Sequence, residues 1–261
     1  MQQEPSQAEL WNSVSENWRI QEEGAKPVYE AILNTLAISA GQSVLDIGCG
    51  TGYFLSLLAP YDVVLTGADI AASQLEVAKR YLPTATYAVA GMEALPFEDA
   101  SFDYVVANNS VQFSPDTHKA LNEIYRVLKP GGKFVVTLWD EPRKSEAFAY
   151  FEVFYAITGQ SMETSIPFNL SKNGLIHELL QTAGFRVQAS QQVTYARTYT
   201  DTDTAVKAIL ASGPAINAIG KSSRALVAER VTNAIQQYMQ PDGSYSIKNA
   251  FVFTTAEKPG I

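Results

Sequence analysis

Residues 44–54 read VLDIGCGTGYF and place three glycines at alternate positions, two residues after a carboxylate. Glycine has no Cβ atom, so Gly48, Gly50 and Gly52 permit unusual backbone dihedrals and let the main chain touch a ligand. A dinucleotide-binding loop shares this property, but its spacing is G-x-G-x-x-G and it holds a pyrophosphate at a helix N-terminus. Here the spacing is G-x-G-x-G, and the carboxylate of Asp46 would repel a pyrophosphate.

Asp46 suits a cationic ligand, because an anion beside the loop attracts an ammonium or sulfonium group. S-adenosylmethionine carries both groups. A second acid, Asp69, follows Gly48 by 21 residues at the expected end of the next strand. In other Rossmann-type sites an acid at this point accepts hydrogen bonds from both ribose hydroxyls. Singly, each feature has a structural explanation, such as a tight turn, a helix cap or a solvated acid. Their strand-loop-helix-strand order predicts a site for a cationic nucleoside.

Short β-rich runs alternate with helical patterns in the middle of the chain, which indicates βαβ units and a mostly parallel sheet. The expected strands are residues 43–47, 63–69, 86–90, 102–107, 133–139, 185–195 and 249–256. The expected helices are 52–58, 72–81, a helix with its apolar face at Leu121, Ile124, Val127 and Leu128 that KPGG (129–132) terminates, and 173–182. We therefore predict an α/β fold. It is a Rossmann-like, doubly wound, mostly parallel seven-stranded sheet with helices on both faces and a helical cap.

We expect a single domain over residues 1–261. Its cofactor-binding core covers 39–139, and 171–196 and 247–256 supply the remainder of the sheet. Three segments fall outside the alternation: helical patterns at 1–38, an aromatic-rich stretch at 140–170, and 197–246, which contains an amphipathic helix. Ligands in open α/β sheets bind beyond the carboxyl ends of the strands, where such segments can fold over the site. We predict that the three segments form a cap; packing against the flank of the sheet is the alternative.

Composition narrows the classes of partner. The chain has a formal net charge of −8 and no run of lysine or arginine, which disfavours nucleic acid. No stretch approaches the ~20 apolar residues of a membrane helix, and the N-terminus lacks the pattern of a signal peptide. The single cysteine, Cys49, fits a reducing compartment, and no cysteine-histidine cluster suggests a metal. We expect a cytoplasmic monomer or homodimer with a small-molecule acceptor and without membrane insertion.

Four longer stretches carry a family resemblance: VLDIGCGTGYF, GADIAASQLEVAKRY, GMEALPFEDASFDYVVANNSVQF and EIYRVLKPGGKFVVTLW. With these the chain resembles the class I S-adenosylmethionine-dependent methyltransferases of the small-molecule type, the group that includes the ubiquinone and menaquinone biosynthesis methyltransferases. The resemblance is close over about residues 40–140 and looser at LLQTAGF (179–185). It implies S-adenosyl-L-methionine as cofactor, S-adenosyl-L-homocysteine as product, and methyl transfer to a small molecule.

The resemblance also implies roles for single residues. The residues implied at the cofactor are Asp46, Gly48, Cys49, Gly50 and Gly52 at its amino-acid end, Asp69 at the ribose, Ile70, Gly91, Met92 and Glu93 at the adenine, and Asn108 at the methionine moiety. Relatives often have an aspartate where Gly91 stands, so adenine recognition would use Met92, Glu93 or water. Trp18 stands where relatives often have an aromatic residue in a helix that closes over the cofactor; core packing is its alternative.

Methyl transfer from a sulfonium is an in-line displacement, and holding the acceptor atom about 3 Å from the methyl group supplies much of the catalysis. A general base is optional, and we assign none. His118 and His177 are expected at the surface. Some relatives have a histidine where Gln112 stands, and glutamine cannot act as a base but can orient an acceptor. We therefore expect catalysis by proximity, with Gln112, Phe113 and Trp18 bordering the acceptor pocket.

The acceptor itself is left open by the sequence. The aromatic residues at 148–155, with Phe168 and Tyr195, suit an apolar or aromatic molecule, although helical spacing also fits core packing. The N-P-P-Y-type signature of nucleic-acid amino-methyltransferases is absent, because the sequence reads ANNSVQF. Two other functions stay open: an S-adenosylmethionine-binding protein without transferase activity, and a nicotinamide-dependent oxidoreductase.

Overall fold

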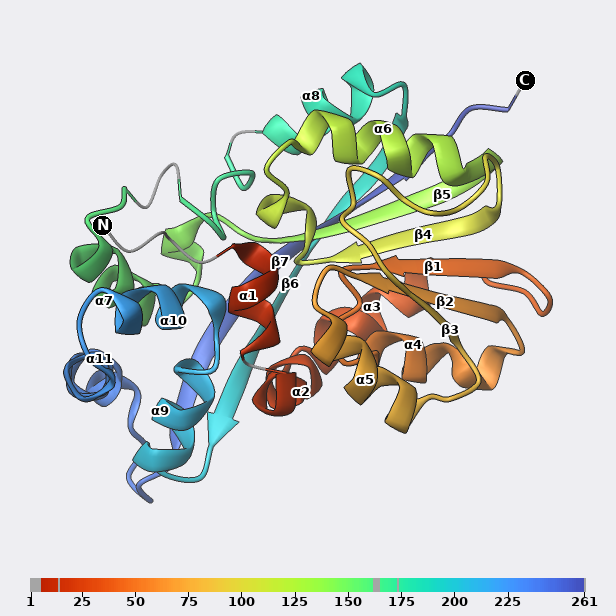
Figure 1. Cartoon of the computed structure of the whole chain (residues 1–261). Helices are drawn as coiled ribbons and strands as arrows, with labels where there is room; N and C mark the ends of the chain where they lie inside the picture. Colours follow the sequence, from red (N-terminus) through yellow and green to blue (C-terminus); the bar gives the residue numbers. More distant parts are fainter. Residues whose placement is uncertain (1–5, 14, 162–164, 173, 261) are drawn as a thin grey trace.

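The computed structural model describes residues 6–13, 15–161, 165–172 and 174–260 (Figure 1). One seven-stranded sheet has the order β3-β2-β1-β4-β5-β7-β6. Its strands are β1 (Ser43–Ile47), β2 (Val64–Asp69), β3 (Thr86–Val89), β4 (Phe102–Asn108), β5 (Leu128–Trp139), β6 (Arg186–Tyr199) and β7 (Tyr245–Glu257). Only β7 runs antiparallel to its neighbours, β5 and β6. The predicted mostly parallel sheet is confirmed.

Helices cover both faces of the sheet, which confirms the doubly wound fold class. The helices of one face are α3 (Lys26–Thr35), α4 (Tyr53–Leu58) and α5 (Ala72–Tyr81), and those of the other are α6 (Thr117–Val127) and α8 (Leu175–Thr182) (Figure 1). Val105 and Ala107 of β4 pack into the core beneath α6, whereas Tyr104 and Val106 pack into the core beside α4. Because successive side chains of a strand point to opposite faces, a strand covered on both sides reads as a continuous apolar run.

The prediction was wrong at the end of α6. The helix ends at Val127, and Leu128 is already extended as the first residue of β5, with KPGG lying inside that strand. Leu128 remains buried in the same core as the apolar face of α6, which explains why its spacing reads as helical. Proline disfavours helical geometry at the residue before it, so the chain leaves the helix ahead of Lys129 and Pro130.

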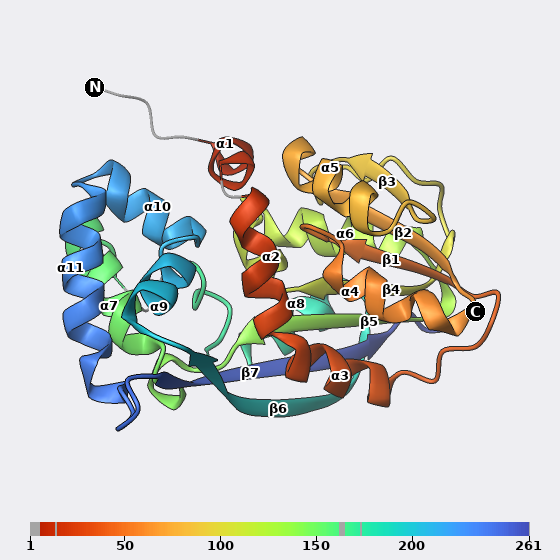
Figure 2. The same cartoon turned by 90° about the horizontal axis from the view of Figure 1, so that it is seen from below.

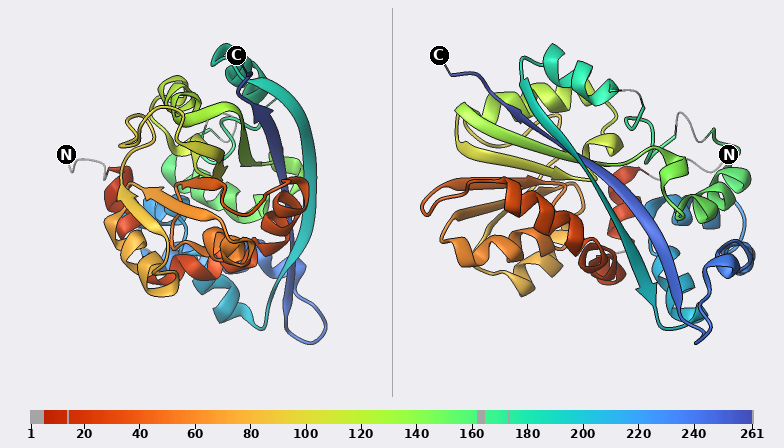
Figure 3. Two further views of the ribbon diagram at one scale, coloured as in Figure 1. Left: turned by 90° about the vertical axis from the view of Figure 1, so that its right-hand side faces the viewer. Right: turned by 180° about the vertical axis from the view of Figure 1, so that it is seen from behind.

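The strands β6 and β7 are longer than predicted. The expected boundaries 185–195 and 249–256 miss four residues at the end of β6 and four at the start of β7, where Arg197 pairs with Ile247 and Tyr199 with Tyr245. Most of β6 is exposed and polar, because it forms the edge of the sheet, so its sequence lacks a strong strand signal. The two strands form a ribbon that runs past the rest of the sheet (Figure 3).

A second group of helices gathers around the far end of this ribbon. It consists of α7 (Phe148–Thr158), α9 (Thr202–Ile209), α10 (Gly213–Gly220) and α11 (Arg224–Ile235). Their apolar side chains share one buried cluster with Tyr199, Tyr245 and Ile247. The short helices α1 (Gln7–Asn12) and α2 (Ser15–Gly24) lie between this group and α5 (Figure 2). Residues 1–5, 14, 162–164 and 173, which belong to the predicted cap, sheet and helix segments, lie outside the described residues.

A matched pair of valines tests the two-sided core. Val105 in β4 is 0% exposed and Val89 in the edge strand β3 is 61% exposed. We expect Val105→Ala to lower the free energy of unfolding by about 2 kcal/mol or more, because it removes buried methyl groups and leaves a cavity. Val89→Ala should change it by no more than about 0.5 kcal/mol. Urea denaturation measures both, and equal effects would contradict the assignment of β4 to the centre of the core.

Candidate functional site

The glycine loop lies where the strand order reverses, because β1 has β2 on one side and β4 on the other. In open α/β sheets this switch point is where ligands bind. The backbone N–H groups of Gly48 and Cys49 donate to the carbonyl of Ala68 at 2.7 and 3.1 Å, which ties the loop to the end of β2. Gly48 has φ of 69°, and a Cβ atom there would lie 2.4 Å from the Cβ of Ser110. The loop therefore needs glycine both for its backbone geometry and for space.

Asp46 lines the cavity beside this loop, and the residue is only 1% exposed. Among the described atoms, its Oδ1 has no hydrogen-bond partner. Burial raises the pKa of Asp46 well above its usual range, and the neighbouring carboxyl groups of Glu22 and Asp69 raise it further. A buried carboxyl group with a free oxygen costs free energy until a donor or cation reaches it. Asp46 is therefore a ready site for a positively charged group.

Asp69, at the end of β2, holds the loop in place. Its Oδ2 accepts a hydrogen bond from the N–H of Gly50 at 2.9 Å, and its Oδ1 accepts one from the N–H of Ala71 at 2.8 Å. Burial raises the pKa of Asp69, while these backbone bonds act in the opposite direction. Each carboxylate oxygen keeps a second lone pair for a ligand hydroxyl.

A third acid, Glu22, comes from α2 and was not predicted. Its Oε1 accepts from the N–H of Thr51 at 3.0 Å, and its Oε2 accepts from the hydroxyl of the same threonine. Burial raises the pKa of Glu22 to about 8. A Cβ atom on Gly50 would lie 2.1 Å from Oε1 of Glu22. The absence of a side chain at Gly50 thus lets α2 close down on the glycine loop.

One large cavity joins these acids to the second group of helices, with an empty volume of about 1540 Å³ that includes its open mouth. A site for one drug-sized ligand usually measures ~300–1,000 Å³. The predicted residues that line the cavity are Trp18, Asp46, Gly48, Cys49, Gly50, Asp69, Ile70, Gly91, Met92, Glu93, Asn108, Gln112 and Phe113. Gly52 does not line it. It caps α4 with φ of 75°, and a Cβ atom there would lie 3.1 Å from the Cβ of Ala78, behind the loop.

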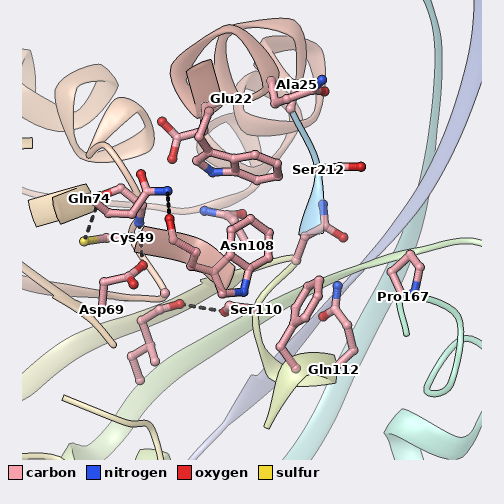
Figure 4. Close-up of a pocket in the computed structure, with 18 of the residues that line it drawn as sticks. Glu22, Ala25, Cys49, Asp69, Gln74, Asn108, Ser110, Gln112, Pro167 and Ser212 are labelled. Carbon is pink, nitrogen blue, oxygen red and sulfur yellow. Dashed lines mark hydrogen bonds between the residues drawn. The ribbon is translucent and has the colours of Figure 1, made fainter. Parts of the chain in front are cut away.

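Asn108 and Gln112 supply two amide side chains to the cavity wall (Figure 4). Gln112 is 0% exposed, and neither its Nε2 nor its Oε1 has a partner among the described atoms. Asn108 accepts a hydrogen bond from the Thr137 hydroxyl at 3.2 Å, whereas its Nδ2 has no described partner. Buried amides are normally hydrogen-bonded, so both side chains are poised for groups of a bound molecule.

Aromatic rings from α1 and α2 line the cavity. The ring of Trp11 lies 4.8 Å from that of Trp18 and 5.2 Å from that of Phe113, edge to face in both pairs. The Nε2 of Gln74 donates to the carbonyl of Trp11 at 3.3 Å, which fastens α1 to α5. Trp18 thus lies at the cavity, as its predicted role requires, rather than in the core of the sheet.

The sequence reasoning missed the lining residues Trp11, Glu22, Gln74 and Arg197. Gln74 lies in the stretch GADIAASQLEVAKRY but was assigned no role, and the other three belong to no motif with a fixed spacing. Glu22 stands beside Glu23 in a polar helix, a pattern typical of a solvated face. Only the folding of distant segments onto the strand ends reveals Trp11, Glu22 and Arg197.

Other chemistries find no support in the part of the chain that the structure describes. His118 and His177 do not line the cavity, and no group of side chains there could hold a metal ion. Cys49 is a free, buried thiol whose pKa is raised well above its usual range by burial, which disfavours a nucleophile. None of the helices in this part is both long and apolar enough to traverse a bilayer.

The chain resembles known proteins mainly over the segment that carries the glycine loop and the parallel strands. A family model described as a methyltransferase domain matches residues 45–136. The uncharacterized methyltransferase sll0829 of Synechocystis sp. is 32% identical over 166 residues, which are 63% of this chain and 76% of that protein. A malonyl-[acyl-carrier protein] O-methyltransferase of Erwinia billingiae is 42% identical over 93 residues, 36% of this chain and 37% of that protein.

Solved structures extend the likeness beyond the core. Phosphoethanolamine N-methyltransferase 2 of Haemonchus contortus, in complex with phosphomonomethylethanolamine and S-adenosylhomocysteine, superposes with a TM-score of 0.56 at 25% identity and covers 88% of this chain and 52% of that one. The chain spans only 36–58% of the length of several other curated methyltransferases that it matches. The matched motifs, the sheet order and the likeness to sll0829 together show that the chain belongs to the class I S-adenosylmethionine-dependent methyltransferases.

Proposed function

We propose that this protein binds S-adenosylmethionine and transfers its methyl group to a small-molecule acceptor. The observation that carries the proposal is the buried carboxyl group of Asp46, whose free oxygen opens into the cavity beside the glycine loop. A nicotinamide dinucleotide would bring a pyrophosphate to this point, and three neighbouring acids would repel it. The ammonium and sulfonium groups of the proposed donor are instead attracted.

The cavity offers a partner for each part of the donor. Asp46 would bind the ammonium group, and the free lone pairs of Asp69 would take the ribose hydroxyls. Ile70 is 42% exposed at the rim, although it is a large apolar residue, and an adenine ring would cover it. Gly91 opens the wall next to Glu93, whose carboxylate can accept from the adenine amino group. Met92 also lines this part of the cavity, and its backbone N–H would donate to a ring nitrogen.

Acceptor positioning falls to Gln112 and the groups around it. When bound, S-adenosylmethionine supplies a methyl group on a sulfonium, so the acceptor needs alignment more than activation. The unpaired amide of Gln112 can donate to and accept from an acceptor, and Asn108 lines the same cavity. Water takes the acceptor proton in this scheme, because glutamine binds no proton at neutral pH. Catalysis then rests on proximity and orientation.

We infer the remaining organisation from the same arrangement. Residues 39–139 would form the cofactor-binding core, and helices of 1–38, 140–170 and 197–246 would cap the acceptor side, because side chains from all three segments line the cavity. A monomer or homodimer would suffice, since one chain supplies every proposed contact. Buried, unpaired Cys49 is compatible with the cytoplasm.

The direct test of the proposal is transfer of label. The protein is incubated with methyl-labelled S-adenosylmethionine and a metabolite extract, and mass spectrometry identifies the molecule that gains the label. A labelled small molecule, absent from a reaction without protein, is the expected outcome. Donor binding without any labelled product would contradict the proposed transfer.

Asp46→Asn tests the electrostatic part. We expect the dissociation constant for S-adenosylmethionine to rise about 10- to 100-fold, because a hydrogen bond to a charged group is worth about 1.5–3 kcal/mol. The unliganded variant should be at least as stable as the parent, since it lacks a buried, unpaired acid. Isothermal titration calorimetry and thermal unfolding measure the two effects. The control is Asp99→Asn, which changes an exposed acid distant in sequence from Asp46. An unchanged dissociation constant for S-adenosylmethionine in Asp46→Asn would refute the assignment.

Donor binding should also depend on pH. Burial raises the pKa of Glu22 to about 8, so this acid binds a proton near neutrality, and burial also raises the pKa of Asp46 well above its usual range. A cationic ligand favours the ionised acids and lowers their pKa, so binding releases protons. The dissociation constant should therefore fall as the pH rises from 6 to 8. Calorimetry in buffers of different ionisation enthalpy counts the protons. Donor binding to Glu22→Gln should release fewer protons than binding to the parent. The exposed control Glu30→Gln should release as many protons as the parent. A dissociation constant that does not change with pH would contradict this prediction.

Gln112→Ala separates acceptor positioning from donor binding. With the acceptor found by labelling, we expect kcat/KM to fall about tenfold or more, the equivalent of about 1.4 kcal/mol for a lost hydrogen bond. The dissociation constant for S-adenosylmethionine should stay within about twofold of the parent value. Steady-state kinetics and calorimetry measure the two quantities, with the exposed Gln181→Ala on α8 as control. Unchanged kcat/KM would place the acceptor elsewhere.

A further inference from the structure

Charged side chains are distributed unevenly over the cavity wall. Four acids line it: Glu22 in α2, Asp46 and Asp69 near the ends of β1 and β2, and Glu93 in the segment that follows β3. Among the described residues that line the cavity, Arg197 is the sole lysine or arginine. It stands near the end of β6, on the ribbon that reaches the second group of helices. The acids and the guanidinium thus belong to opposite ends of the fold.

The charge of Arg197 is not neutralised within the described part of the chain. Its guanidinium donates to the carbonyl oxygens of Ile20, at 3.2 Å, and Gln21, and to the side-chain Oε1 of Gln21. All three acceptors are neutral, and no described acid forms an ion pair with Arg197. The guanidinium also bonds to the neutral side chain of Tyr199, so at least one of its five donors is left for a ligand. A half-buried guanidinium that keeps its full charge favours an anion, and its planar fork suits a carboxylate or phosphate.

Much of the cavity wall that β5, β6, β7, α7 and α9 supply is apolar. The side chains that form it are Trp139, Tyr150, Phe151, Tyr195, Ile209 and Phe251. Three of these rings pack together, with Tyr195 and Trp139 each against Phe251 at centroid distances of 5.9 and 4.4 Å. Such a surface binds hydrocarbon chains or rings through burial of apolar area. The only full charge that it meets is positive.

From this arrangement we infer that the methyl acceptor is an apolar molecule with an anionic group, a carboxylate or phosphate ester, which Arg197 binds while Gln112 faces the part to be methylated. The inference rests on the proposed function and names its substrate class. It disfavours amines that are cationic at neutral pH, because they would meet the guanidinium at one end of the cavity and a sulfonium at the other.

A purely structural role for Arg197 predicts a different experimental result. The guanidinium holds the C-terminal end of α2, the helix that carries Trp18 and Glu22 to the glycine loop. A Cβ atom on Gly24 would lie 1.8 Å from the Nη2 of Arg197, so the contact is close. If Arg197 served only as this support, its loss would loosen α2 and weaken donor binding. If it binds the acceptor, its loss raises the KM for the acceptor.

The wild-type protein alone provides the first test. Methyl-labelled S-adenosylmethionine and a metabolite extract are used as above, and the elemental composition and charge of the labelled product are determined, which distinguishes a carboxylate from a phosphate ester. We expect a product with a free acidic group, and the neutral primary amide or alcohol matched to its acceptor should show a kcat/KM at least 10-fold lower. A labelled neutral or cationic product overturns the inference and leaves the proposed function standing. No labelled product at all overturns both.

Arg197→Gln provides the second test, with Arg186→Gln on the same strand as an exposed control. For the acidic acceptor we expect KM to rise about 10- to 100-fold, with kcat within about threefold and the dissociation constant for S-adenosylmethionine within about twofold. The neutral analogue should react equally well with parent and variant. Equal losses for both acceptors, or weakened donor binding, would show that Arg197 only supports α2. Should the variant fail to fold, the comparison of acid and neutral analogue in the parent protein still decides.

Discussion

Three carboxyl groups meet at one turn of this protein, and no described side chain supplies an ion pair to any of them. Asp46 and Asp69 arrive at the ends of neighbouring parallel strands, and Glu22 arrives from α2. Burial raises the pKa of each, and repulsion from neighbouring acids raises the pKa of Asp46 and Glu22 further. In the unliganded protein these buried acids lie close together without an ion-pair partner among the described side chains, which costs free energy. A bound cationic ligand lowers that cost. The same interaction explains why the turn must be free of side chains, since the ligand and α2 both approach its backbone.

The rest of the fold determines what else reaches this turn. Parallel strands with opposite crossovers bring the ends of β1, β2 and β4 together, which is a property of every doubly wound sheet. The particular feature here is the long ribbon of β6 and β7, which holds the second group of helices beside the same edge. The helices α1 and α2 bridge the two parts, through Trp11 against Phe113 and Glu22 against Thr51. The cavity that results has an acidic end and an apolar end with one cation.

Sequence reasoning succeeds where local signals agree. The strand at 43–47 and the helix at 72–81 have the predicted boundaries, because buried apolar runs and amphipathic spacing within a βαβ unit leave little choice. It fails at Leu128, where tertiary packing is compatible with either helix or strand and the following Lys129-Pro130 step decides. It also fails at the polar end of β6, whose pairing depends on β7 and not on its own composition. Glu22 and Arg197 could not be found from spacing, since they reach the cavity only through contacts between distant segments.

The most direct measurement of the central interaction is a crystal structure of the protein with S-adenosylhomocysteine. We expect the amino nitrogen of the ligand about 3 Å from the Oδ1 of Asp46, with the ribose hydroxyls on Asp69. A ligand whose amino group lies away from Asp46, or a nicotinamide dinucleotide with its pyrophosphate along the glycine loop, would contradict the account.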